Sequence, residues 1–211
     1  MASVAFTATC GLRATGQSRV PPSGSALLVS NHLSYLDVFV LGIPLARPLN
    51  YVARSTLFFL GLGAFIRSVG GFPIQREGMG ASGLKETLRR LKYGGIVVLF
   101  PEGRRSEDGR MGELKSGIAA LASKAKVPVI PAGIVGTFEA WPRGRLFPRP
   151  HPIWIEYGEP IYPADFAGLS HLEMTALIHE RIRQCQEAAE RGLARASGRV
   201  MEGSEVGEHS G

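Results

Sequence analysis

Short apolar runs separated by polar segments recur along the chain, at spacings that favour strands alternating with helices. Residues 26–30 (ALLVS) and 95–100 (GIVVLF) have the length and β-branched content of buried strands. Four further segments have similar character, and we interpret the last as a strand interrupted by Pro131: 49–53, 70–76, 153–158 and 127–137.

Three other segments show the spacing of helices, over residues 83–92, about 115–125 and about 170–196. The longest places Ile178, Ile182, Cys185 and Ala189 on one stripe, which indicates a packing face. Strands alternating with helices predict an α/β fold with a mixed, mostly parallel sheet flanked by helices.

The length of 211 residues fits one domain. We expect residues 1–11 to form a short N-terminal segment, 12–197 the domain and 198–211 a disordered tail. The longest uncharged apolar runs, 55–66 and 127–138, fall short of the roughly 20 residues that cross a bilayer.

The two cysteines, Cys10 and Cys185, match no metal or redox spacing and fit a reducing compartment. Arg13 is the first basic residue, so the charged start of a secretory signal is missing. These features predict a cytoplasmic protein without a spanning segment.

The chain is basic, with a formal net charge of +6. Residues 1–76 contain six arginines and a single carboxylate, Asp37. Such a balance suits phosphates, an anionic membrane or an acidic carrier protein. Because lysine tracts, aromatic RNA-binding signatures and helix-turn-helix patterns are missing from the sequence, we expect no nucleic-acid partner.

The first candidate chemistry lies in residues 31–37, NHLSYLD. Ser34 followed by Asp37 has the form of a capping box, which predicts a helix starting at Ser34 with His32 in the preceding turn. Asp37 can then point back at the imidazole, fix its tautomer and leave the other ring nitrogen as a base. Alternatively, Asp37 only caps the helix, and His32 is an incidental turn residue.

A second candidate site follows the strongest strand, in residues 100–106, FPEGRRS. Arginines, a serine and a glycine in one loop are suited to hold a phosphate. Glu102 can bind a substrate hydroxyl or orient an arginine, and Arg76 is a further candidate for anion contact. The same composition also fits an exposed turn.

Other chemistries have weaker support. Gly78, Gly80 and Gly83 satisfy the dinucleotide pattern G-x-G-x-x-G, but Arg76 and Glu77 separate them from the strand, which favours a flexible loop. The sequence holds no G-x-S-x-G elbow and no P-loop. The remaining histidines form no ligand cluster in sequence, so we expect neither a metal nor a bound cofactor.

Four blocks in order resemble those of the glycerolipid acyltransferase family, the lysophosphatidic acid acyltransferases and their relatives. They are NHLSYLD, GGFPIQR, FPEGRRS and VPVIPAGIVGT, within a similarity that runs from about residue 12 to 160. The resemblance implies that His32 is the general base, held by Asp37, in acyl transfer from acyl-CoA or acyl-carrier protein to lysophosphatidic acid.

The resemblance also implies an acceptor-binding set. Its expected members are Arg76, Glu102, Gly103, Arg105 and Ser106, with Asn31, Arg104 and Pro131 as additional candidates. Arg104 stands where the family usually has a small residue, which suggests an altered head-group preference. Other lysolipids or glycerol phosphate as acceptor, and a non-catalytic lipid-binding protein of the same fold, remain open.

Peripheral contact with the inner face of a membrane is expected from the same resemblance. Residues 57–66 (LFFLGLGAFI), between Arg54 and Arg67, are a candidate interfacial segment. A core helix is the alternative for this segment.

Overall fold

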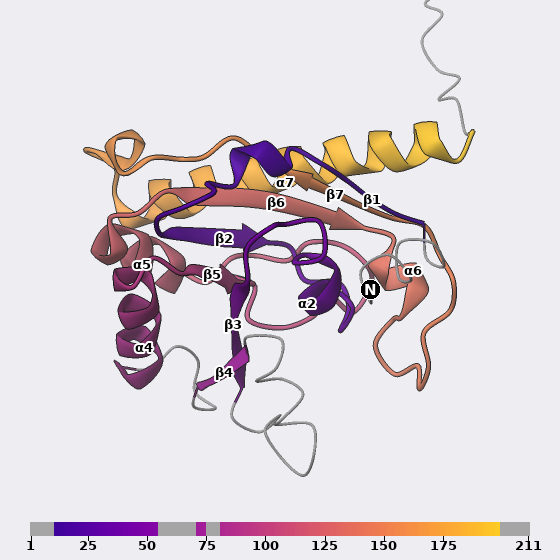
Figure 1. Ribbon diagram of the computed structural model, residues 1–211, viewed down its shortest axis with the longest axis horizontal. Helices are drawn as coiled ribbons and strands as arrows, with labels where there is room; N and C mark the ends of the chain where they lie inside the picture. The colour runs from indigo at the N-terminus through magenta and orange to yellow at the C-terminus, as the bar shows by residue number, and fades with distance from the viewer. Residues whose placement is uncertain (1–10, 55–70, 75–80, 199–211) are drawn as a thin grey trace, which may run out of the picture.

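The computed structural model describes residues 11–54, 71–74 and 81–198, which are organised around one seven-stranded sheet (Figure 1). The strand order is β1-β7-β6-β2-β5-β3-β4. Within these residues β6 and β7 pair antiparallel and every other neighbouring pair is parallel, which confirms the mixed, mostly parallel sheet. The strands are Leu12–Thr15 (β1), Ala26–Ser30 (β2), Leu49–Arg54 (β3), Gly71–Ile74 (β4), Ile96–Leu99 (β5), Val129–Val135 (β6) and Ile153–Tyr157 (β7).

Helices connect and cover these strands. The α-helices are Asp37–Val40 (α2), Ala81–Lys92 (α4), Gly117–Ala125 (α5), Thr137–Ala140 (α6) and His171–Ala196 (α7), and the 3-10 helices are Gln17–Arg19 (η1) and Pro163–Phe166 (η3). Ser170 and Glu173 form a capping box at the start of α7. The predicted stripe of Ile178, Ile182, Cys185 and Ala189 is buried, which confirms it as a packing face.

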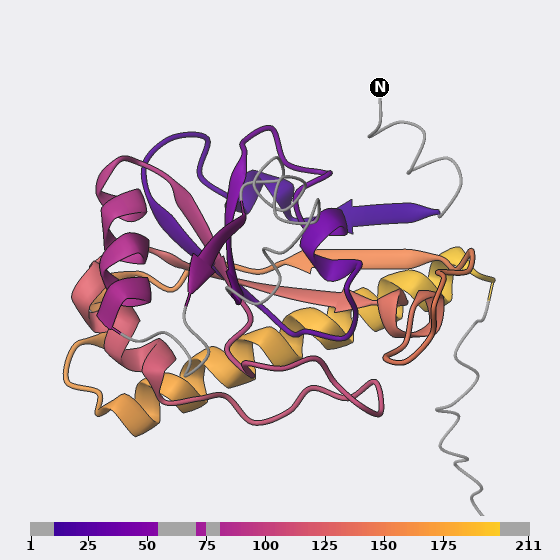
Figure 2. The same ribbon diagram turned by 90° about the horizontal axis from the view of Figure 1, so that it is seen from below.

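Side chains of alternate residues in β2 divide between two apolar layers. Leu28 packs in one cluster with Val40 and Leu41 from the region of α2. Leu27 packs in the other with residues of α4, α5 and α7, including Ile178. Figure 1 shows α7 and α2 on opposite sides of β6 and β2, and Figure 2 gives the view from below. The fold is therefore a sheet between two helical layers, and the loops at its strand ends are left for a site.

Pro131 does not interrupt β6, contrary to the sequence interpretation. Its carbonyl accepts the N–H of Gly158, and the antiparallel register with β7 ends next to it, at the pair Ala132–Tyr157. Because the two backbone polar groups of a strand residue point to the same side, the missing N–H of Pro131 falls where this ladder stops. A proline is tolerated there without breaking the strand.

Several expectations fall on residues outside the described ranges. These are the N-terminal residues 1–10, the interfacial candidate 57–66, Arg76, the glycines Gly78 and Gly80, and the tail from residue 199. Gly83 is described, and it is buried inside α4 rather than in a turn before a helix.

Candidate functional site

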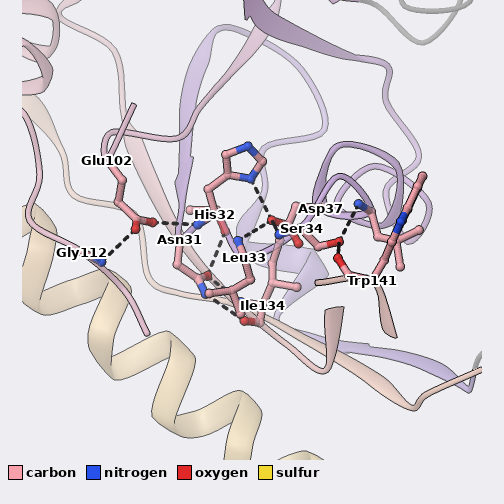
Figure 3. A network of polar contacts seen from close by, with 11 residues as sticks. Asn31, His32, Leu33, Ser34, Asp37, Glu102, Gly112, Ile134 and Trp141 are labelled. Carbon is pink, nitrogen blue, oxygen red and sulfur yellow. Dashed lines mark hydrogen bonds and ion pairs between the residues drawn. The ribbon is translucent and has the colours of Figure 1, made fainter. Parts of the chain in front are cut away.

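Two neighbouring parallel strands, β2 and β5, end beside each other and deliver the two candidate loops to one place. His32 lies two residues after β2, and Glu102 lies three residues after β5. The carboxyl ends of parallel strands are the usual position of sites in open α/β sheets. Figure 3 shows His32, Asp37 and Glu102 in one network of polar contacts.

Asp37 holds both the ring and the backbone of the His32 turn. Its Oδ2 atom lies 2.8 Å from His32 Nδ1 and accepts the N–H groups of Leu33 at 2.6 Å and Ser34 at 2.8 Å (Figure 3). Asp37 is fully buried, whereas the His32 side chain retains 16 % exposure. Since a carboxylate can only accept, Nδ1 carries the proton, and Nε2 keeps its lone pair as a potential base.

The helix that carries Asp37 begins later than the capping box predicts. α2 starts at Asp37 rather than at Ser34. The Asp37 carboxylate reaches back to the Ser34 N–H as predicted, but Ser34 Oγ accepts from Leu36 N–H and donates to the carbonyl of Trp141 at 2.8 Å. The hydroxyl is thereby used to fasten this turn to the segment after α6.

The imidazole plane is fixed by stacking as well as by Asp37. The rings of His32 and Phe100 lie 4.0 Å apart between centroids, with 17° between their planes. Phe100 directly follows β5, so the second loop supports the ring that the first loop presents. The hydrogen bond to Asp37 and the stacking on Phe100 together restrict the orientation of the imidazole before a reaction begins.

Asn31 joins the end of β2 to β6. Its Nδ2 donates to the carbonyl of Ile134 at 2.9 Å, and its Oδ1 accepts the Ile134 N–H at 2.8 Å. Asn31 is completely buried, so its amide acts as an additional rung of the sheet. This contact places the His32 turn relative to β6 and makes Asn31 a positioning residue.

Glu102 is buried and uses both carboxylate oxygens on backbone donors. Oε1 accepts the His32 N–H at 2.7 Å, and Oε2 accepts the Gly112 N–H at 2.8 Å (Figure 3). Burial raises the pKa of the Glu102 carboxyl, and the two hydrogen bonds oppose that rise. In this structure the carboxylate ties the loop after β5 to the His32 turn.

Ser106 closes the same connection from the other side. Its N–H donates to the carbonyl of His32 at 2.8 Å. Its hydroxyl lies 3.1 Å from Asp108 Oδ1 and accepts the Gly109 N–H at 2.9 Å. Ser106 therefore shapes the loop through contacts within the protein.

Two arginines, Arg104 and Arg105, stand between Gly103 and Ser106 in the loop after β5. Gly103 has φ +72°, a backbone conformation that favours glycine, and the end of the Lys115 side chain lies beside it, 2.6 Å from where a Cβ would be. The Arg105 guanidinium lies 3.5 Å above the centre of the Tyr35 ring, and Arg104 pairs with Glu107 at 3.7 Å. No role for Lys115 or Tyr35 was predicted from the sequence, although Tyr35 stands between His32 and Asp37.

Pro131 lies apart from this network, on the side of the sheet that α7 covers. A Cβ at Gly158 would meet both the Pro131 ring and the Cys185 sulfur, which shows how tightly this region packs. The structure thus brings together Asn31, His32, Asp37, Glu102 and Ser106, and it places Pro131 in the packing against α7.

Residues 11–135 match the family model described as Acyltransferase, which is more than half of the chain. The chain belongs to the acyltransferase family. The His32 turn and the loop after β5 both lie within the matched region.

Individual relatives of this acyltransferase agree. It is 29 % identical over 182 residues to the 1-acyl-sn-glycerol-3-phosphate acyltransferase of Bacillus subtilis, covering 83 % of this chain and 88 % of the relative. It is 34 % identical over 133 residues to the chloroplastic LPAT1 enzyme of Arabidopsis thaliana, of which it covers 37 %. The crystal structure of the LPA acyltransferase PlsC from Thermotoga maritima matches with a TM-score of 0.71 and 27 % identity, over 90 % of this chain and 74 % of that one.

The described part of this acyltransferase has neither a helix suited to span a bilayer nor a cluster of metal-ligating side chains. None of its helices is both long and apolar enough to pass through a bilayer. Within the same ranges there is no group of three or more His, Cys, Asp or Glu side chains that could hold a metal ion.

Proposed function

We propose that this acyltransferase moves a fatty acyl group from a thioester donor to the free hydroxyl of lysophosphatidic acid, forming phosphatidic acid. The contact between His32 Nδ1 and Asp37 Oδ2, at 2.8 Å, carries the proposal because it leaves Nε2 as a base at a partly exposed position. The relatives named above act on this acceptor according to their names, which supports the same acceptor here.

The reaction needs one base and no acyl-enzyme. His32 Nε2 takes the proton of the acceptor hydroxyl as its oxygen attacks the thioester carbonyl carbon. The tetrahedral intermediate collapses, the C–S bond breaks, and the departing sulfur takes the proton from His32, giving an ester and a free thiol. Asp37 stabilises the imidazolium formed in between, and general base catalysis of this kind contributes about 10²–10⁴-fold.

We assign the acceptor's phosphate to cationic side chains of the loop after β5. The Arg105 guanidinium lies over the ring of Tyr35, three residues after His32, and the end of the Lys115 side chain lies beside Gly103 in the loop after β5. Arginine binds phosphate through paired N–H donors, which favours Arg105 as the main contact. Arg76 and Arg104 are further contacts in this proposal, and either acyl-CoA or acyl-carrier protein serves as the donor.

The test is transfer of a radiolabelled acyl group from each donor to lysophosphatidic acid. Wild type should form phosphatidic acid, His32→Ala should lose that activity, and His171→Ala, which removes an exposed histidine at the start of α7, should keep it. Equal activity of a folded His32→Ala protein would contradict the mechanism. Transfer by wild type to a different lysolipid or to glycerol phosphate alone would contradict the acceptor, and no transfer to any acceptor would favour a lipid-binding protein.

A further inference from the structure

The loop after α6 exposes two adjacent large apolar side chains. Residues 143–150 (RGRLFPRP) are all exposed, and within them Leu146 is 78 % and Phe147 is 70 % accessible. Single exposed apolar residues are common on soluble proteins and need no explanation. Two consecutive exposed apolar residues in one loop require an explanation.

Hydrogen bonds across its base hold this loop in a defined shape. The Trp141 indole N–H donates to the carbonyl of Arg145 at 2.8 Å, and the Arg149 N–H donates to the carbonyl of Ala140 at 2.8 Å. The apolar pair lies between these two contacts in sequence. Leu146 and Phe147 are thus presented by an organised loop.

The same loop is basic. Arg143, Arg145 and Arg149 surround the apolar pair, and no acidic residue occurs between Glu139 and Glu156. Arg143 pairs with Glu107 of the loop after β5 at 2.8 Å. Apolar side chains beside arginines are suited to the boundary between anionic head groups and acyl chains. The apolar side chains enter the membrane there, and the arginines bind phosphates.

A hydrogen bond and an aromatic contact join this loop to the His32 turn. Ser34 Oγ donates to the carbonyl of Trp141, and the Tyr35 and Trp141 rings lie 5.7 Å apart. Figure 3 shows Trp141 beside Ser34 and Asp37. A bilayer that contacts the loop would therefore lie close to the turn that carries the base.

We propose that residues 141–150 are a membrane-docking loop for anionic bilayers, with Leu146 and Phe147 inserted and Arg145 on the lipid phosphates. The inference rests on the proposed function in one respect, since it requires an acceptor that resides in a membrane. The loop presents the acceptor to His32 from the bilayer surface. The loop does not include the candidate segment 57–66, which lies outside the described residues.

The test compares sedimentation with vesicles of phosphatidylglycerol and phosphatidylcholine. The double variant Leu146→Ser/Phe147→Ser should lower the partition coefficient on mixed vesicles about tenfold or more, because it removes the inserted apolar area. Arg145→Gln should lower it about fivefold on mixed vesicles and leave it unchanged on pure phosphatidylcholine.

A matched control replaces an exposed aromatic residue and an exposed leucine elsewhere. Tyr93→Ser/Leu172→Ser changes side chains of 77 % and 80 % exposure, in the segment after α4 and at the start of α7. Figure 1 shows those parts at the end of the molecule opposite α6. This control should bind vesicles as wild type does, and circular dichroism should show native helix content in every variant.

Binding is scored without any reaction, so its outcome is independent of the proposed acceptor. Equal loss in the control and the loop variant, unchanged partitioning of the loop variant, or no vesicle binding by wild type would each overturn the inference. A weaker interaction of Arg145→Gln with acyl-carrier protein, combined with unchanged vesicle binding, would assign the loop to the carrier instead. In an active enzyme, the loop variant should also lower the ratio of transfer to vesicle-borne over short-chain, monomeric acceptor.

Discussion

Glu102 Oε1 accepts the backbone N–H of His32 at 2.7 Å. This hydrogen bond joins the segment 100–106 to the segment 31–37. Ser106 N–H completes the connection by donating to the carbonyl of the same histidine. Both backbone polar groups of His32 are therefore held by the loop after β5. The loop after β5 therefore positions the proposed base, and substitutions in this loop should alter the conformation of the His32 turn.

Glu102→Gln should change how the stability of the protein depends on pH. Burial raises the pKa of Glu102 above its ordinary value of 4.5, so the folded state holds this proton at pH values where the unfolded chain has released it. The contribution of Glu102 to stability is complete below about pH 4.5 and falls as pH rises through the folded value. The melting temperature of wild type relative to Glu102→Gln should therefore fall between pH 4 and pH 7.

Calorimetry at a series of pH values measures this difference. The glutamine also loses one of the two backbone hydrogen bonds, which lowers the stability of the variant by about 1–3 kcal/mol at every pH. The change of the stability difference with pH therefore reports the titration of the carboxyl group. A difference that grew with rising pH would show that the hydrogen bonds to the carboxylate outweigh its burial.

Asp37→Asn should lower kcat about 10²-fold or more, with a smaller effect on KM for the acceptor. The amide cannot stabilise the imidazolium as a carboxylate does. If its oxygen keeps the three donors, its NH₂ occupies the position of Oδ1, which is buried and has no partner within the described residues. Steady-state kinetics measures the split between kcat and KM, with Asp165→Asn, which changes an exposed carboxylate of η3, as control. A rise in KM with unchanged kcat would mean that Asp37 acts in binding.

Tyr35 should act as a positioning residue for Arg105 through its ring. Tyr35→Leu removes the cation–π contact, worth about 0.5–1 kcal/mol at an exposed site, and should raise KM for lysophosphatidic acid about two- to fivefold. Tyr35→Phe keeps the ring and should remain near wild type. Inhibition by inorganic phosphate should weaken in the leucine variant alone. Equal defects in both variants would assign the effect to the Tyr35 hydroxyl.

The parts of this molecule that depend on local pattern were predictable from the sequence. The buried strands 26–30 and 95–100 and the buried stripe of α7 follow from apolar spacing, and the structure confirms them. The approach of Asp37 to His32 follows from the capping sequence, because a carboxylate in a first helical turn points back toward the chain that enters it.

Features that depend on tertiary pairing were not predictable in this way. β1 is four residues long with only Leu12 buried, and it exists because β7 offers an edge to pair with. Ser34 Oγ donates to the carbonyl of Trp141, 107 residues away in the sequence, and α2 begins later than the capping box predicts. The hydrogen bond from the His32 N–H to Glu102 forms because β2 and β5 are neighbours in the sheet, and no local spacing in the sequence predicts that pairing.

Gly133→Ala should destabilise the protein strongly through the contact between β6 and α7. A Cβ at Gly133 would overlap the α7 backbone at Cys185 and Gln186, and a helix backbone cannot rotate away as a side chain can. The cost of overpacking is about 1–3 kcal/mol or more. Gly117→Ala is the matched control, since Gly117 is the first residue of α5 and a Cβ there meets nothing within 4 Å. Urea unfolding of both variants measures the difference, and equal midpoints would show that α7 can shift away from β6 at little cost.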